Sequence, residues 1–195
     1  MLDHAAGSGQ HTFKERAQDC YETPPEAVCA LLKVEKLPKV VWEPACGPGS
    51  IVRTLRSAGH TVLATDLHDY EDSWIPAWGY KSGVNFLTCK VSTTIPPAIV
   101  TNPPYQLAQG FIEKAIELKV PLVIMLLRLA FLESKRRTEI LERHGLARIH
   151  VFKRRLPMMH RRGWTGKKAS SAMAFAWFCW VRGHIGPTTI DRIDW

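Results

Sequence analysis

Four consecutive residues carry the most specific chemistry in this sequence: Asn102, Pro103, Pro104 and Tyr105. The Asn102 side chain offers a carbonyl oxygen as acceptor, and the two prolines stiffen the backbone while their own carbonyls stay available. Tyr105 adds a flat aromatic face. Acceptors beside an aromatic plane suit a planar group that carries an NH2, because the acceptors can orient the amine while the ring stacks on its scaffold.

The elements around this tetrapeptide place it at the end of a strand. An apolar stretch, 98–100, precedes it, and apolar residues at helical spacing follow over 106–118, which predicts a buried strand, a turn and a helix. In open α/β sheets, ligands bind where the strands end. The simpler interpretation is an Asn-Pro turn that only starts the helix.

A second turn with binding potential runs from Glu43 to Gly49 (Glu-Pro-Ala-Cys-Gly-Pro-Gly). It follows a predicted strand, 39–42, and precedes a predicted helix that ends at Gly59. Nucleotide-binding loops have this context, because glycines let the backbone approach a ligand and the helix N-terminus offers free N–H groups. The third glycine of the dinucleotide fingerprint and the Lys-Ser/Thr of a P-loop are absent. We favour a binding loop over an ordinary tight turn.

A second predicted strand, 60–65, ends at Asp66. An acid at this position of a βαβ unit hydrogen-bonds ribose hydroxyls, and the lack of an adjoining arginine argues against a 2′-phosphate. The alternative is a solvated loop aspartate. Residues 84–87 are predicted to end the third strand, and further strands are predicted at 121–127, 149–152 and 172–181. A charged helix is predicted at 133–143.

Together, these segments resemble amino-methyltransferases that use S-adenosylmethionine, most familiarly the DNA adenine-N6 methyltransferases. The resemblance rests on Asn-Pro-Pro-Tyr at 102–105 and on the acid and Gly-x-Gly of 43–49, and it covers roughly 20–182. It implies the Rossmann-like fold of class I methyltransferases: α/β, with a seven-stranded, mostly parallel sheet and a C-terminal antiparallel hairpin. In its small size, the chain resembles the enzymes of this kind that phages and mobile elements carry.

The resemblance also implies cofactor contacts. A Tyr-x-Thr-Pro element, 21–24, would contact the methionine carboxylate of S-adenosylmethionine, although a helix capped by Thr23 with Glu26 in a capping box explains the same residues. Glu43 would face the positively charged methionine end, and Asn85 would bond the adenine in place of the family's usual acid. The predicted cofactor-binding residues are Tyr21, Thr23, Pro24, Glu43, Ala45, Cys46, Gly47, Gly49, Asp66, Leu67, Asn85, Phe86 and Asn102.

The implied reaction is methyl transfer to the exocyclic N6 amino group of adenine in DNA. Asn102 and the Pro103 carbonyl would accept the two amine hydrogens and aim the nitrogen lone pair at the methyl group. Tyr105 would stack on the flipped base. The predicted catalytic residues are Asn102, Pro103, Pro104 and Tyr105. No metal is expected, because the leaving sulfide is neutral.

The charge of the chain indicates a polyanionic partner. Its formal net charge is +8, and seven basic residues with no acid lie in 153–168, where each contact to a phosphate would add salt-dependent affinity. A solvated loop is the alternative. The predicted nucleic-acid-binding residues are Lys153, Arg154, Arg155, Arg161, Arg162, Trp164, Lys167 and Lys168. For the aromatic residues of the loop 68–83 (Tyr70, Trp74, Trp78 and Tyr80), packing is favoured over base stacking.

Several classes are disfavoured. The five cysteines are scattered, without zinc-ligand spacing, which indicates reduced thiols in a cytoplasmic protein. The most apolar run, 120–132, is too short for a bilayer and contains Arg128, and the N-terminus lacks the apolar core of a signal peptide. We expect a flexible tail over 1–19 and a single catalytic domain over 20–195. The oligomeric state stays open.

Three other functions remain open. RNA adenine is an equivalent target, because the site would receive one unpaired base either way. Release-factor methyltransferases share Asn-Pro-Pro-Tyr and methylate protein glutamine, but they usually add an N-terminal helical domain, whereas the first predicted strand here begins at Lys39. An inactive nucleic-acid-binding module would keep the fold without the cofactor. Without a separate recognition domain, any reading of target sequence would come from the loops 68–83 and 153–171.

Overall fold

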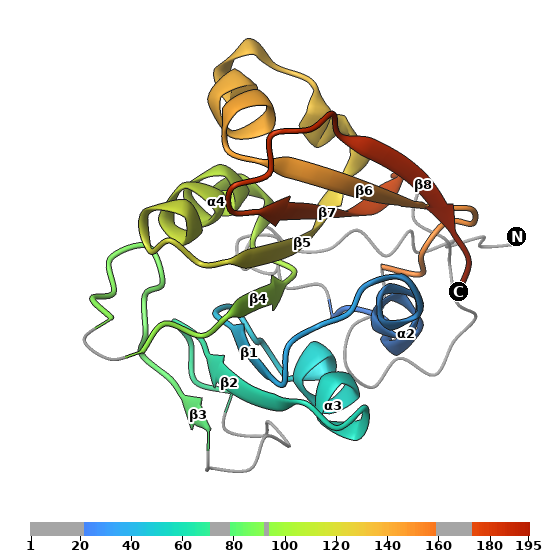
Figure 1. Ribbon diagram of the computed structural model, residues 1–195. Helices are drawn as coiled ribbons and strands as arrows, with labels where there is room; N and C mark the ends of the chain where they lie inside the picture. Colours follow the sequence, from blue (N-terminus) through green and yellow to red (C-terminus); the bar gives the residue numbers. More distant parts are fainter. Residues whose placement is uncertain (1–21, 71–78, 92–93, 159–172) are drawn as a thin grey trace, which may run out of the picture.

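The computed structural model describes residues 22–70, 79–91, 94–158 and 173–195. A twisted sheet runs through the molecule, and helices lie on both of its faces (Figure 1). The strand order is β3-β2-β1-β4-β5-β7-β6-β8. The strands are β1 (Val40–Glu43), β2 (Thr61–Thr65), β3 (Tyr80–Lys81), β4 (Ala98–Thr101), β5 (Leu122–Arg128), β6 (Leu146–Phe152), β7 (Phe175–Val181) and β8 (Thr189–Ile193).

The sheet is mostly parallel. Strands β1 to β5 all pair in parallel, whereas β7 lies antiparallel between β5 and β6, so the predicted C-terminal hairpin is confirmed. The order reverses between β1 and β4: successive strands extend to β3 on one side and to β5 on the other. Such a switch point opens a crevice at the carboxyl ends of the two central strands.

Helices cover the two faces separately. On one face, α2 (Pro25–Val34) and α3 (Ser50–Ser57) pack through Leu31 and Leu55 into a core that includes Trp177. On the other face, α4 (Ala108–Glu117) packs into a core that includes Phe178. Successive side chains of a strand point to opposite faces, so these two neighbours in β7 serve different cores. In the described part of the chain, no helix is long and apolar enough to cross a bilayer.

The start of α2 differs from the predicted capping box. Pro24 is the N-cap, and no side chain caps the helix. The backbone carbonyl of Pro24 accepts a hydrogen bond from the Ala27 N–H at 2.9 Å, which satisfies one of the free donors of the first turn. The Thr23 hydroxyl is used elsewhere: it accepts a hydrogen bond from the Asn102 side chain.

Three other segments differ from their predictions. Residues 84–87 form no strand and lead into a turn at 86–88, where the Asn85 Oδ1 accepts the Leu87 N–H at 3.0 Å, a local bond that competes with an extended path. The predicted helix 133–143 is broken into a 3₁₀ turn (Lys135–Arg137) and a π-helical turn (Glu139–Arg143). Strand β8 pairs in parallel with β6 and makes the sheet eight-stranded instead of seven-stranded.

Candidate active site

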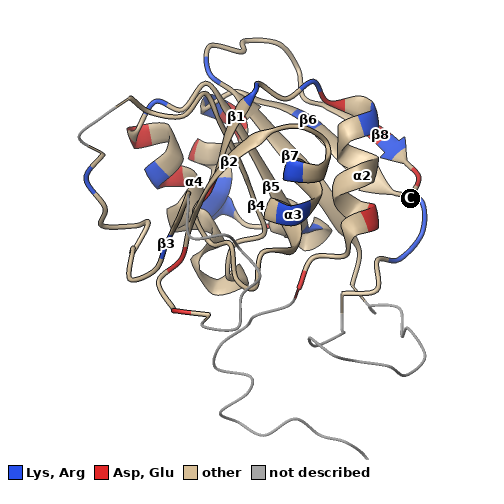
Figure 2. Ribbon diagram, turned by 90° about the horizontal axis from the view of Figure 1, so that it is seen from below, with Lys and Arg blue, Asp and Glu red and all other residues tan. Residues whose placement is uncertain are grey.

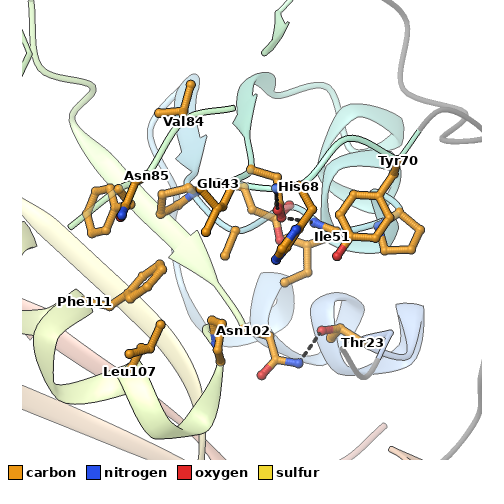
Figure 3. A pocket seen from close by; sticks show the side chains of 18 of the residues that line it. Thr23, Glu43, Ile51, His68, Tyr70, Val84, Asn85, Asn102, Leu107 and Phe111 are labelled. Atoms are coloured by element: carbon orange, nitrogen blue, oxygen red, sulfur yellow. Dashed lines mark hydrogen bonds between the residues drawn. The ribbon is translucent and has the colours of Figure 1, made fainter. Parts of the chain in front are cut away.

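A cavity of about 320 Å³ lies at the carboxyl ends of β1, β2 and β4 (Figure 3). Its walls come from the turn after β1, the segment after β2, the segment 84–87, the Asn-Pro-Pro segment after β4 and the residues before α2. These segments are far apart in the sequence, and the switch point in the strand order brings them together. The crevice predicted at the strand ends is therefore present.

The turn after β1 has the backbone of a ligand-binding loop. Gly47 and Gly49 adopt positive φ values of 49° and 91°, a region that side chains with a Cβ disfavour. Gly49 is also the N-cap of α3, so the helix N-terminus lies beside the cavity. The Gly47 N–H donates to the Asp66 Oδ2 at 2.8 Å and joins the turns after β1 and β2.

Glu43, the last residue of β1, is a buried acid in the cavity wall. Its exposed fraction is only 2%, and its Oε2 has no hydrogen-bond partner among the described residues. Burial raises the pKa of this carboxyl well above its ordinary value, and the nearby Asp66 carboxylate raises the pKa further. A ligand that brings a positive charge or a hydrogen-bond donor would offset both effects.

Asp66 lies beyond the end of β2 and is held by two backbone amides. Its Oδ2 accepts the Gly47 N–H, and its Oδ1 accepts the His68 N–H, each at 2.8 Å. A carboxylate has about four lone-pair sites, so the fixed group keeps acceptor capacity for ligand hydroxyls. The carboxylate therefore lies in the cavity wall in a defined orientation.

Asn102 follows β4 and reaches the same cavity. Its Nδ2 donates to the Thr23 Oγ1 at 3.1 Å (Figure 3). This bond fixes the orientation of the amide, with the nitrogen toward Thr23 and the carbonyl as the acceptor end. Thr23 is itself positioned from α3, because the Ser50 hydroxyl donates to the Thr23 carbonyl. A residue predicted to touch the cofactor thus also orients the predicted catalytic amide.

The Asn-Pro-Pro-Tyr segment divides two cavities. Asn102 and Pro104 line the 320 Å³ cavity, and Pro103 is buried between them. Tyr105 starts a 3₁₀ turn (Tyr105–Leu107) and instead lines a smaller cavity beyond it. Its ring centroid lies 5.8 Å from that of Phe175.

The structure brings most of the predicted cofactor residues together. The ones that line the larger cavity are Thr23, Glu43, Ala45, Gly47, Asp66, Leu67, Asn85, Phe86 and Asn102. Pro24, Cys46 and Gly49 adjoin the cavity without lining it. Cys46 points into the apolar core, and burial raises the pKa of its thiol. Tyr21 lies outside the described residues.

Several residues of the cavity wall are not among the predicted cofactor-binding or catalytic residues, and four of these come from two segments. His68 and Tyr70 follow Asp66, and Leu107 and Phe111 come from the start of the α4 region (Figure 3). Phe111 belongs to the apolar face of a predicted helix and was therefore assigned only to the core. Tyr70 belongs to the loop for which packing was favoured, and it lines the cavity instead. Trp74 and Trp78 of that loop lie outside the described residues.

The predicted basic surface is described only in part. Lys153, Arg154 and Arg155 are exposed beyond the end of β6, and Figure 2 shows basic residues beside the C-terminus and on β8. The Arg154 Nε donates to the Asp194 Oδ1 at 3.0 Å, and its guanidinium lies 4.5 Å from the Trp195 ring centroid. The other predicted contacts, Arg161, Arg162, Trp164, Lys167 and Lys168, lie outside the described residues.

Away from the cavity, Glu35, His150 and Cys179 place metal-ligand atoms within 4.8 Å of one another. Arg148 already supplies a positive charge to this cluster: its Nη2 donates to the Glu35 Oε2 at 3.0 Å. The His150 Nε2 lies 2.7 Å from the Glu35 Oε1. We therefore interpret the cluster as an ion-pair network that ties the end of α2 to β6.

No protein-family model matches the chain, and no curated protein matches it in sequence. Solved structures do match. A protein described as the modification subunit of a type I restriction enzyme from Vibrio vulnificus is 15% identical, with a TM-score of 0.57 over 94% of this chain and 46% of that one. A protein described as an RNA methyltransferase from Pyrococcus horikoshii is 17% identical, with a TM-score of 0.58 over 83% and 86%.

A third match, the tRNA (uracil-54, C5)-methyltransferase of Pyrococcus abyssi, was solved with S-adenosyl-L-homocysteine; it is 13% identical, with a TM-score of 0.53 over 79% of this chain and 37% of that one. The chain thus spans about half of the Vibrio subunit. At these identities, the likeness concerns the fold. With its mostly parallel sheet and antiparallel β7, the chain has the Rossmann-like fold of class I methyltransferases.

Proposed function

We propose that this chain transfers a methyl group from S-adenosylmethionine to the N6 amino group of adenine in DNA. One observation carries the proposal: Asn102, with its amide oriented by Thr23, lines the same cavity as Glu43 and Asp66. Asn102 can accept hydrogen bonds from an amine, and the two acids suit a nucleoside that carries a positive charge. All three lie around one cavity, in a chain with a methyltransferase fold.

The cavity residues fit the cofactor by their chemistry. The Glu43 carboxyl would pair with the cationic methionine end, which would compensate the burial of that acid. Asp66 would accept hydrogen bonds from the ribose hydroxyls, and the glycine turn would let the backbone approach the ligand. The Asn85 Oδ1 already accepts the Leu87 N–H, so its NH2 is the end suited to the adenine. Bound S-adenosylmethionine would supply an electrophilic methyl group.

The Asn-Pro-Pro-Tyr segment would orient the adenine amine that receives the methyl group. The amino nitrogen of adenine is a poor nucleophile, because its lone pair is delocalised into the ring. The Asn102 Oδ1 and the Pro103 carbonyl would each accept one amine hydrogen and direct the lone pair into the cavity. Tyr105 would stack on the base, which in duplex DNA must first be flipped out at a cost of a few kcal/mol. The net charge of +8 supports a polyanionic substrate.

A transfer assay tests the substrate. Labelled S-adenosylmethionine is offered with duplex DNA, single-stranded DNA, RNA and protein extract, and the products are analysed as nucleosides and amino acids. We expect N6-methyladenine in DNA. Label in RNA adenine or in glutamine would keep the site and change the substrate, whereas cofactor binding without any label would favour a binding module.

Two variants test the site. Asn102→Ala removes the amine acceptor, so we expect kcat to fall about 100-fold or more, the scale seen when one such group is removed, while cofactor affinity stays within a few-fold. Thr23→Val keeps the shape of the side chain but frees the amide to rotate, so a smaller loss of about tenfold is expected. Unchanged turnover in Asn102→Ala would remove this residue from the mechanism.

A further inference from the structure

A second cavity of about 210 Å³ lies beyond Tyr105, on the other side of the Asn-Pro-Pro-Tyr segment. Its walls come from Tyr105 and Ala108, from the end of β5 and from the turns that follow β5. Whole-ligand pockets measure roughly 300–1,000 Å³, so this space suits one part of a larger ligand. Because the Asn-Pro-Pro-Tyr segment lines both cavities, a group bound in the second cavity would belong to the molecule that receives the methyl group.

Arg128, the last residue of β5, brings a positive charge to this cavity. Its guanidinium lies 4.4 Å from the Tyr105 ring centroid, and its Nε is buried with no hydrogen-bond partner among the described residues. The residues that line the cavity include no acid. A guanidinium is charged at every relevant pH, and a buried donor without an acceptor is costly. An anionic ligand group would neutralise the charge and accept a hydrogen bond from the Nε.

Arg137 also lines this cavity, and its guanidinium already contacts protein groups. Its Nη1 donates to the carbonyls of Phe131 and Glu133, each at 2.9 Å, and its guanidinium lies 4.2 Å from the Phe131 ring centroid. These contacts hold the turns after β5 against the cavity. Two cations and two aromatic rings therefore surround a space next to the predicted catalytic segment.

We propose that Arg128 binds a phosphate of the nucleotide that carries the target amine, next to the face of Tyr105. The proposal rests on the proposed function, and it identifies the methyl-accepting molecule as a polynucleotide. A guanidinium matches the oxygens of a phosphate and stacks on aromatic rings, and both features meet here. A neutral glutamine side chain would offer this cavity no anion.

The test measures binding of a fluorescent, adenine-containing, single-stranded oligodeoxynucleotide to the full chain by anisotropy between 25 and 200 mM salt. Arg128→Gln removes one charge, so we expect about tenfold weaker binding at low salt and a slope of log K against log salt that is smaller by about 0.7. Arg128→Lys keeps the charge and should restore most of the slope. Binding of S-adenosylmethionine by calorimetry reports separately on the fold and on the proposed function.

Arg182→Gln is the matched control, because Arg182 follows β7 at the other end of the β5–β7 pair, where Val181 lies beside Leu122, and its Nη1 donates to the Lys119 carbonyl. It should leave the slope unchanged. If Arg128→Gln keeps the wild-type slope, or if the wild type does not bind the oligonucleotide, Arg128 only supports Tyr105 and the proposal is overturned. If the slope depends on Arg128 but S-adenosylmethionine does not bind, the phosphate site stands and the proposed function fails.

Discussion

Glu43 is an ionisable residue in surroundings that disfavour its charge. Its carboxyl is buried next to Asp66, and both factors raise its pKa. Such a group pairs with a cation only after it loses its proton. The binding of a cationic ligand at this residue is therefore linked to proton release.

We accordingly predict that the affinity for S-adenosylmethionine rises with pH. Between the pKa of Glu43 in the complex, which a cationic ligand lowers, and the raised pKa of free Glu43, each binding event must release a proton, so a higher pH favours binding. Calorimetry in buffers of different ionisation enthalpy would measure the release. Glu43→Gln should bind about 30-fold more weakly at high pH, as expected for the loss of about 2 kcal/mol. An equal pH dependence in the Gln variant would assign the proton to another group.

At the scale of elements, the ion-pair network positions α2. Glu35 follows this helix, and its carboxylate accepts hydrogen bonds from Arg148 and His150 of β6. The other end of α2 carries Thr23, which orients Asn102. The network therefore helps to hold the helix at the distance from the sheet that the site requires.

Glu35 also makes stability depend on pH. Burial alone would raise its pKa, but hydrogen bonds from His150 and Arg148 outweigh burial and lower the pKa from 4.5 to about 2. The folded chain thus binds fewer protons than the unfolded chain between these values. The contribution to stability is complete above pH 4.5 and is lost as the pH falls toward 2.

Urea unfolding measures this effect. Because Arg148 is about a third exposed, the expected destabilisation by Glu35→Gln at pH 7 is reduced to about 2 kcal/mol. The difference between variant and wild type should shrink as the pH is lowered from 4.5. A difference that is constant down to pH 3 would show that Glu35 acts by packing. The surface variant Lys36→Gln serves as the control.

At the scale of the whole molecule, the net charge of +8 favours DNA binding through the surface where basic residues are exposed. Of the described basic residues after β6, Arg154 is already paired with Asp194, whereas Arg155 is exposed, beside the segment that leads to Arg161 and Arg162. An arginine that is paired with a carboxylate attracts a phosphate less strongly. The contributions of these residues to DNA binding should therefore differ.

The salt dependence of binding to duplex DNA separates these contributions. Each lost phosphate contact reduces the slope of log K against log salt by about 0.9. We expect Arg155→Gln to reduce the slope more than Arg154→Gln, and the combined neutralisation of Arg154, Arg155, Arg161 and Arg162 to flatten it most. An unaltered slope in the combined variant would make this a solvated loop without contact to DNA.

The sequence by itself determined the features that depend on neighbouring residues. Apolar runs predicted the strands at 39–42, 60–65, 98–100 and 121–127, and glycine and proline chemistry predicted the turns that begin at Glu43 and Asn102. Because the carboxyl ends of parallel strands meet at one edge of a sheet, the positions of these turns also predicted which segments would form most of the cavity wall. Strand β8 was missed because four of its five residues are exposed, which leaves no alternating apolar pattern.

Only the tertiary structure decided how distant side chains meet. The Thr23–Asn102 bond joins residues 79 positions apart, and no local pattern encodes it; the sequence predicted a helix cap and a cofactor contact for Thr23, but not this bond. The same holds for Arg128 against Tyr105, which depends on β4 and β5 lying side by side. Local preferences act through the backbone of a few residues, whereas these contacts depend on strand order and packing, which only the folded chain defines.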